Sequence, residues 1–154
     1  MKKSILLIGM VVLFAACGAK QDSKTKNSVK ASKSIAYEVL VQDSYGGADS
    51  PEHRVITNAQ ELRKVYGIIN RTRKPGIEVP EIDFSANTVV AIFMGERSSG
   101  GNHIEIEKVE EHEDGIEVKT RNIKPGTGEM TTMAITHPFI FVKLPVSGKE
   151  ITVK

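Results

Sequence analysis

The sequence predicts an α+β domain in which a mostly antiparallel sheet of six to eight strands packs with one amphipathic helix. Three observations predict this class. Short apolar segments, alternating or continuous, recur between residues 35 and 154 and are joined by short loops. One segment alone has the apolar period of a helix, and strand and helix patterns do not alternate as they do in parallel sheets. A small β-sandwich or barrel is the alternative arrangement of the same strands.

Two strands are expected before the helix. Residues 35–42 have period-two spacing, which puts four apolar side chains on one face: Ile35, Tyr37, Val39 and Val41. Residues 53–56 predict a short second strand. The loop between the two strands carries adjacent glycines and Pro51.

The helix has the clearest signals. Asn58 is a favoured N-cap residue, and Glu61 follows it by three positions, as in a capping box. Four apolar residues follow at i, i+3, i+4 and i+7 and predict a buried stripe: Leu62, Val65, Tyr66 and Ile69. Pro75 and Gly76 end the segment. The basic residues near its C-terminus are expected to cap the helix and to face solvent: Arg71, Arg73 and Lys74.

The pattern after residue 80 is β. Residues 88–94 and 139–144 are apolar on both faces, as in central strands. Residues 103–109 alternate, and the Asp-Gly pair at 114–115 predicts a turn into another strand. Weaker patterns predict two more short strands, one around Met133 and Ile135 and one at residues 150–153.

The first 17 residues have the parts of a bacterial export signal. A positive n-region precedes the apolar residues 5–14, and two alanines precede Cys17. The apolar run is too short to span a hydrocarbon core of about 30 Å. Residues 14–17 (Phe-Ala-Ala-Cys) resemble a lipobox, which predicts that Cys17 carries a lipid anchor after cleavage. The alternative is an ordinary secretory signal that ends in Cys.

Charge divides the rest of the chain. The formal net charge is +2, but residues 18–34 carry +4 and residues 35–154 carry −4. Residues 18–34 contain one hydrophobic residue besides alanine, Val29, so they are expected to form a flexible tether. The predicted organisation is a signal peptide at 1–17, a tether at 18–34 and one domain at 35–154. Because this domain is mildly acidic, nucleic acid is disfavoured as a partner.

The chain carries none of the common catalytic motifs. It has no G-x-S-x-G, H-E-x-x-H, Walker or G-x-G-x-x-G sequence, and its single cysteine is the expected lipidation site. We therefore expect no enzymatic activity, no catalytic residue and no cofactor. His103, Glu105 and Glu107 share one strand face and can bind a divalent metal ion, but Ile104 and Ile106 between them fit an ordinary solvated face. No metal is expected on this ground.

The segment 95–103 stands out between two predicted strands. Its glycines permit positive φ and leave backbone N–H groups accessible, and an arginine can bind a carboxylate with two hydrogen bonds. The candidate partner-binding residues are Glu96, Arg97, Ser99, Gly100, Gly101 and Asn102. The alternative is a turn whose glycines serve its geometry alone. A second glycine-rich loop, 124–129, is expected at the same end of the sheet. A binding role requires the two loops to lie together beside exposed apolar surface.

Several segments of this domain resemble a known family. The similar segments are 89–96 (VVAIFMGE), 99–101 (SGG), 104–106 (IEI), 124–126 (KPG) and 135–139 (ITHPF). They resemble the C-terminal domain of the protease complex subunit PrcB family, over roughly residues 57–154. Three positions depart from the family pattern: Ser99 replaces Thr, Asn102 replaces Tyr and His137 replaces Ser. A role that needs the tyrosine ring is therefore not expected in this chain.

The resemblance implies an accessory domain that associates with a surface protease and supports it without catalysis. Together with the leader, it predicts a lipid-anchored, non-enzymatic binding domain of the bacterial cell envelope that supports the assembly or stability of a protease complex. Its expected partners are the membrane, through the lipid, and an envelope protein such as a protease; the inner and the outer membrane both fit. The alternatives are a protease inhibitor and a metal- or small-molecule-binding domain.

Overall fold

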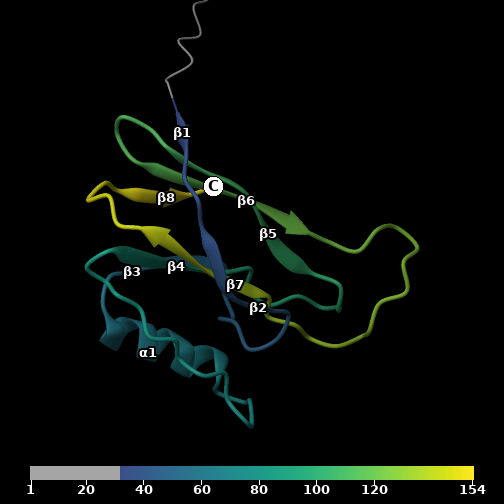
Figure 1. The fold of residues 1–154 in the computed structure, drawn as a ribbon. Helices are drawn as coiled ribbons and strands as arrows, with labels where there is room; N and C mark the ends of the chain where they lie inside the picture. The colour runs from purple at the N-terminus through teal and green to yellow at the C-terminus, as the bar shows by residue number, and fades with distance from the viewer. Residues whose placement is uncertain (1–31) are drawn as a thin grey trace, which may run out of the picture.

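The computed structural model describes residues 32–154, so the predicted signal peptide, Cys17 and most of the tether lie outside the described residues. The described chain is mostly β with one helix, which confirms the predicted α+β class (Figure 1). Its elements are β1 (Lys33–Ser34), β2 (Glu38–Asp43), β3 (Glu52–Ile56), α1 (Ala59–Ile69), β4 (Asn87–Phe93), β5 (His103–Glu111), β6 (Ile116–Ile123), β7 (Phe139–Pro145) and β8 (Ile151–Val153).

The strands form two four-stranded sheets instead of one. One sheet has the order β2-β7-β4-β3 and the other the order β1-β5-β6-β8. Neighbouring strands are antiparallel except β6 and β8, which run parallel. Figure 1 shows three layers, with α1 against one face of the β2-β7-β4-β3 sheet and the second sheet against the other face.

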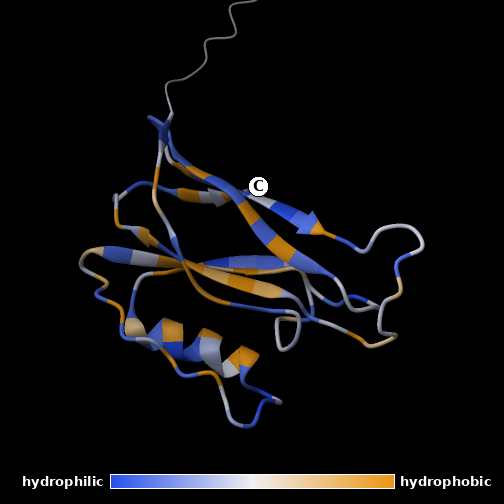
Figure 2. Ribbon diagram, turned by 45° about the vertical axis from the view of Figure 1, so that its right-hand side comes forward, coloured by the Kyte–Doolittle hydropathy of each residue, from blue (hydrophilic) through white to orange (hydrophobic). Residues whose placement is uncertain are grey.

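The central strands β4 and β7 explain why three layers form. Side chains alternate between the faces of a strand, so two strands that are apolar on both faces need cover on both. One core packs with α1 and contains Val89, Ala91, Phe93, Phe139 and Phe141. The other packs with the second sheet and contains Val90, Ile92, Met94, Ile140, Val142 and Leu144. Figure 2 shows the hydrophobic residues of α1 on the side that faces the sheet.

The helix confirms its predicted start and buried stripe. The Asn58 side chain accepts a hydrogen bond from the Glu61 backbone N–H at 2.9 Å, and Thr57 N donates to the Glu61 carboxylate at 3.3 Å. The four residues of the predicted stripe are buried. Within residues 32–154 there is no helix with the length and hydropathy needed to span a membrane.

The basic residues after the helix differ in part from their predicted role. Arg71 pairs with Asp49 at 3.3 Å, and Arg73 pairs with Asp43 at 2.8 Å. They therefore connect the end of α1 to the β2–β3 loop (residues 44–51) and its flank. Arg71 and Lys74 are exposed, as predicted, whereas Arg73 is partly buried, because the fold brings Asp43, which is distant in sequence, beside it.

The first strands also differ from the period-two prediction. A register shift between Val39 and Val41 leaves Val39 45% exposed, whereas Leu40 and Val41 pack against the helix-side core. A bulge of this kind adds one residue and exchanges the faces of the residues on either side. In addition, Lys33–Ser34 form β1 against β5, so strand pairing begins within the segment predicted as tether.

The predicted strand around Met133 and Ile135 is not formed. Residues 124–138 connect β6 to β7 without a strand, and only Thr136 makes an isolated bridge, with Arg97. Apolar residues at alternate positions predicted a strand here, but no neighbouring strand of the described chain pairs with them.

Candidate functional site

Two loops meet at one end of the two sheets. The β4–β5 loop (residues 94–102) and the β6–β7 loop (residues 124–138) lie together at the right-hand end in Figure 1. Arg97 N donates to Thr136 O at 2.8 Å, and Thr136 N donates back to Arg97 O at 2.9 Å. Gly100 N donates to Thr132 O at 2.9 Å. The two glycine-rich loops therefore form one surface, as the binding hypothesis required.

The β2–β3 loop joins the same end. His137 N donates to Ser44 O, and Gly47 N donates to His137 O, both at 2.9 Å. The His137 Nε2 atom lies 3.5 Å from Asp49 Oδ1 and 3.7 Å from Glu96 Oε2. Residues from three loops thus meet here: Asp49, Glu96 and His137. Together with the backbone hydrogen bonds, these contacts hold the β6–β7 loop onto the body of the domain.

The adjacent glycines permit the close approach of the two loops. Gly101 has φ +78°, and a Cβ atom there would lie 2.9 Å from Pro125 Cγ. A Cβ atom on Gly100 would collide with the Thr132 hydroxyl. Both positions therefore face the β6–β7 loop.

Substitution Gly101→Val is expected to destabilise the protein more than Gly128→Val. Both glycines have positive φ, which costs a β-branched residue about 1–3 kcal/mol, but a Cβ on Gly128 meets nothing within 4 Å. The difference between the free energies of unfolding of the two variants, measured in urea, reports how much the packing of one loop on the other stabilises the protein. Equal losses of stability would show that this packing contributes nothing.

The other predicted contact residues are used largely within the loop. The Arg97 guanidinium donates to Glu96 O at 2.8 Å and to Met94 O at 2.7 Å, so it folds back on its own loop. Asn102 is buried and donates to Ser99 O at 2.8 Å. The same Ser99 oxygen accepts from the Thr136 hydroxyl. Asn102 thus braces the turn at the position where the family pattern has Tyr, and Glu96 keeps an exposed side chain.

The most exposed large apolar residues of the described chain lie on the β6–β7 loop, and they were not among the predicted contacts. Met130 and Met133 are 100% and 99% exposed, and Ile135 is 61% exposed. Sequence reasoning placed Met133 and Ile135 in a strand and so missed this surface. The sequence signal for this surface is that a Gly- and Thr-rich loop contains three large apolar residues in the six-residue stretch 130–135.

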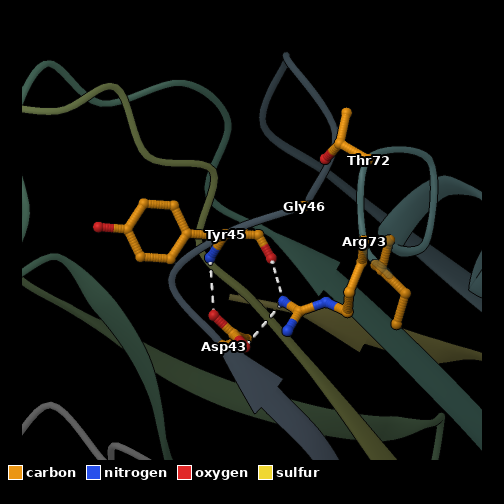
Figure 3. A pocket seen from close by; sticks show the side chains of 6 residues that line it. Asp43, Tyr45, Gly46, Thr72 and Arg73 are labelled. Carbon is orange, nitrogen blue, oxygen red and sulfur yellow. Dashed lines mark hydrogen bonds and ion pairs between the residues drawn. The ribbon is translucent and has the colours of Figure 1, made fainter. Parts of the chain in front are cut away.

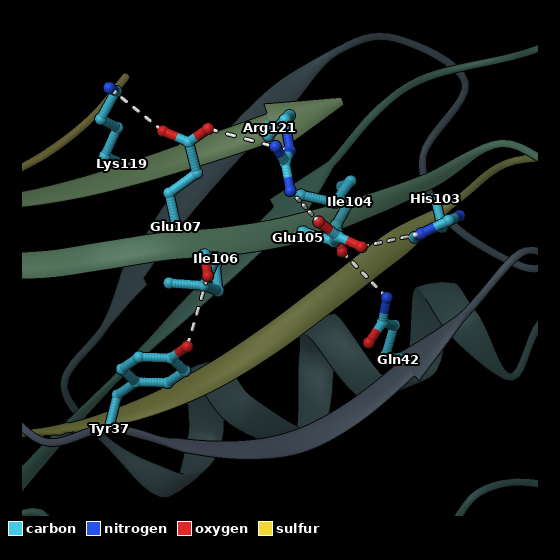
Figure 4. A network of polar contacts seen from close by, with 9 residues as sticks. All are labelled: Tyr37, Gln42, His103, Ile104, Glu105, Ile106, Glu107, Lys119 and Arg121. Atoms are coloured by element: carbon cyan, nitrogen blue, oxygen red, sulfur yellow. Dashed lines mark hydrogen bonds and ion pairs between the residues drawn. The ribbon is translucent and has the colours of Figure 1, made fainter. Parts of the chain in front are cut away.

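The His103 face is a network of ion pairs (Figure 4). Glu105 pairs with Arg121 at 2.7 Å and lies 3.4 Å from His103, while Glu107 pairs with Lys119 at 3.1 Å. The hydrogen bond from Arg121, followed by that from His103, holds the pKa of Glu105 below its ordinary value. In residues 32–154 no three His, Cys, Asp or Glu side chains gather as metal ligands. The ion pairs disfavour the metal alternative, because both carboxylates already have cationic partners.

Two side chains also cover the backbone of β5. Gln42 Nε2 donates to Ile104 O at 2.8 Å, and Tyr37 donates to Ile106 O at 3.3 Å. These bonds link β5 to the chain near β2, so the two sheets are connected along this side (Figure 4).

Acid is expected to destabilise the sheet that contains β5. Four carboxyl groups of this sheet have a lowered pKa, each chiefly because of one basic partner: Glu105 with Arg121, Glu110 with Lys108, Glu111 with Lys149 and Glu117 with Lys154. A pKa lowered by folding stabilises the protein above the unfolded value of about 4.3, and that contribution is lost as the pH falls. The urea midpoint should be lower at pH 3 than at pH 6, and high salt should reduce the difference. An equal or higher midpoint at pH 3 would contradict these pairings.

A hollow beside the end of α1 is occupied by an internal ion pair (Figure 3). Its volume is about 220 Å³, below the roughly 300–1,000 Å³ of small-molecule sites. Arg73 projects into it and donates to Asp43 and to Tyr45 O, while Tyr45 N donates to Asp43. Because the guanidinium is already neutralised, this hollow does not support the small-molecule alternative.

The fold and these contacts define a β-rich domain whose exposed loops are braced at one end. Residues 88–145, from β4 through both loops to the end of β7, match the family model described as PrcB C-terminal. This segment is therefore similar to a PrcB C-terminal domain, and the family resemblance predicted from the sequence is confirmed over these residues. The match begins after α1, later than the resemblance over residues 57–154 suggested. Comparisons with curated proteins and with solved structures gave no match.

Proposed function

We propose that this protein is a lipid-anchored, non-enzymatic accessory domain of the bacterial cell envelope that binds a protease complex and supports its assembly or stability. The match of residues 88–145 to the PrcB C-terminal domain carries the proposal, because the resemblance found in the sequence is to the protease complex subunit PrcB family. The matched residues contain both loops that meet at the exposed end.

The domain acts in this proposal by surface complementarity. The loops are braced by backbone hydrogen bonds before any partner binds, which reduces the conformational entropy lost on binding. β1 pairs with Glu110 and Glu111 at the last residues of β5, whereas the β4–β5 loop precedes its first residue. A nine-residue strand is about 30 Å long, so an anchor joined to the chain before β1 leaves the loops at the far end.

Deletion of the coding sequence tests this function against the inhibitor alternative. If the domain supports a protease complex, both the amount of assembled complex and its activity in the envelope should fall, and the full-length protein should restore them. If the domain is an inhibitor, protease activity should rise on deletion. Unchanged complex and activity would contradict both functions.

Direct association needs a second experiment. The tagged full-length protein is crosslinked in intact cells and isolated from detergent extracts, and we expect a protease subunit among the crosslinked products. The purified protein should not cleave casein or fluorogenic peptides by itself. Crosslinks to other envelope proteins, with no protease among them, would contradict the proposal.

A further inference from the structure

The two methionines of the β6–β7 loop have no cover in the described structure. Met130 and Met133 are almost fully exposed, whereas Met94, directly after β4, is 2% exposed. Single exposed apolar residues are common, but Ile135 is also exposed, which gives three within six positions of a loop that projects beyond the sheets (Figure 1). Several exposed apolar residues on one projecting loop are typical of a protein contact.

The loop beneath these side chains is braced. Gly126 N donates to the Glu129 carboxylate at 2.9 Å, and Glu129 N donates to Gly126 O at 3.1 Å, which forms a turn directly before Met130. Beyond it, Thr132 O accepts from Gly100 N. The backbone is therefore held while the thioether side chains stay adaptable, a combination suited to filling an irregular pocket.

Besides a different protein, three candidates for covering these methionines are the preceding segment of this chain, a second copy of the chain and a membrane. All three fit poorly. Residues 18–31 of this chain contain one hydrophobic residue besides alanine, so they offer almost nothing apolar to cover the loop. A second copy would set one convex loop against another and bury little area. Membrane-binding loops combine apolar with basic residues, but the β4–β5 and β6–β7 loops have two acids, Glu96 and Glu129, for two bases, Arg97 and Lys124. The loop also lies at the opposite end of β5 from the point where the chain enters the fold.

We propose that the β6–β7 loop inserts Met130 and Met133 into a concave apolar pocket on a subunit of the protease complex. This inference rests on the proposed function and assigns the contact within it. The projecting loop supplies the convex part of the interface, so the protease supplies the pocket.

Methionine oxidation tests whether the pocket covers this loop. Dilute peroxide should oxidise Met130 and Met133 rapidly in the purified full-length protein, with buried Met94 as the slow internal reference. In native envelopes the oxidation of Met130 and Met133 should be about tenfold slower, which corresponds to nine molecules in ten having these residues covered. In envelopes that lack the protease, the fast rate should return. Protection that persists without the protease would overturn the proposal.

Two further arms examine the other occupants. Purified protein mixed with phosphatidylethanolamine–phosphatidylglycerol vesicles should show no protection at Met130 and Met133. A concentration series of the protein alone should show none either. Protection by vesicles would assign the loop to a membrane, and protection that rises with concentration would assign it to a second copy; either result overturns the proposal.

Substitutions separate this contact from the proposed function. Met130→Glu/Met133→Glu should lower crosslinking to the protease about 10- to 100-fold, while Met130→Leu/Met133→Leu and the distant Val146→Glu should leave it near wild type. The melting temperatures of these variants should match that of the wild type, because the substituted side chains are exposed. If the glutamate variant still crosslinks fully, the loop is not the contact and the proposed function stands. If the wild type does not crosslink to the protease, the proposed function itself fails.

Discussion

Cys17→Ser is expected to move the protein from the membrane fraction to the soluble fraction. Serine has no thiol to receive the diacylglyceryl group, so the variant lacks the lipid anchor. The apolar run of the uncleaved leader, residues 5–14, would reach only about 15 Å even if it were helical, against a hydrocarbon core of about 30 Å. Fractionation with an alkaline carbonate wash, together with the mass of the N-terminal peptide, measures the effect.

The matched control changes the charge of the tether and keeps the cysteine. Lys20→Ser/Lys24→Ser should remain in the membrane fraction at high salt, because acyl chains anchor without electrostatic help. If Cys17→Ser also remains there after the carbonate wash, the protein is held by something other than lipid on Cys17.

Phe141→Ala is expected to lower the free energy of unfolding by about 3–5 kcal/mol. Phe141 is fully buried in the helix-side core, and its ring lies 5.3–5.6 Å from three other aromatic rings: Tyr66, Phe93 and Phe139. Its removal leaves a cavity between α1 and the sheet that rigid strands cannot close. Since domains are stable by only about 5–15 kcal/mol, urea unfolding should show a strongly reduced midpoint.

The control is a second aromatic residue outside the core. Tyr45 lies on the β2–β3 loop with an exposed side chain, and its contact with Arg73 uses the backbone oxygen. Tyr45→Ala should therefore change the free energy of unfolding by no more than about 0.5 kcal/mol. Similar losses for both variants would mean that Phe141 is not part of a tightly packed core.

The candidate site could be predicted only in part. The meeting of the two glycine-rich loops followed from the number of strands between them. The roles of the residues did not follow, because Arg97 and Asn102 bond inside the loop while Met130 and Met133 carry the exposed surface. A sequence pattern identifies which residues can make contacts, but the position of neighbouring chain segments determines which contacts they make.

The sequence by itself determined the local features of this protein: the start of α1, its buried stripe, the apolar central strands and the family of residues 88–145. These depend on residues a few positions apart or on a continuous apolar run. Only the tertiary structure decided the division into two sheets, the bulge beside Val39 and the exposure of Met133. Those features depend on which distant strand or loop lies alongside, and strand pairing is a long-range choice that no short segment encodes.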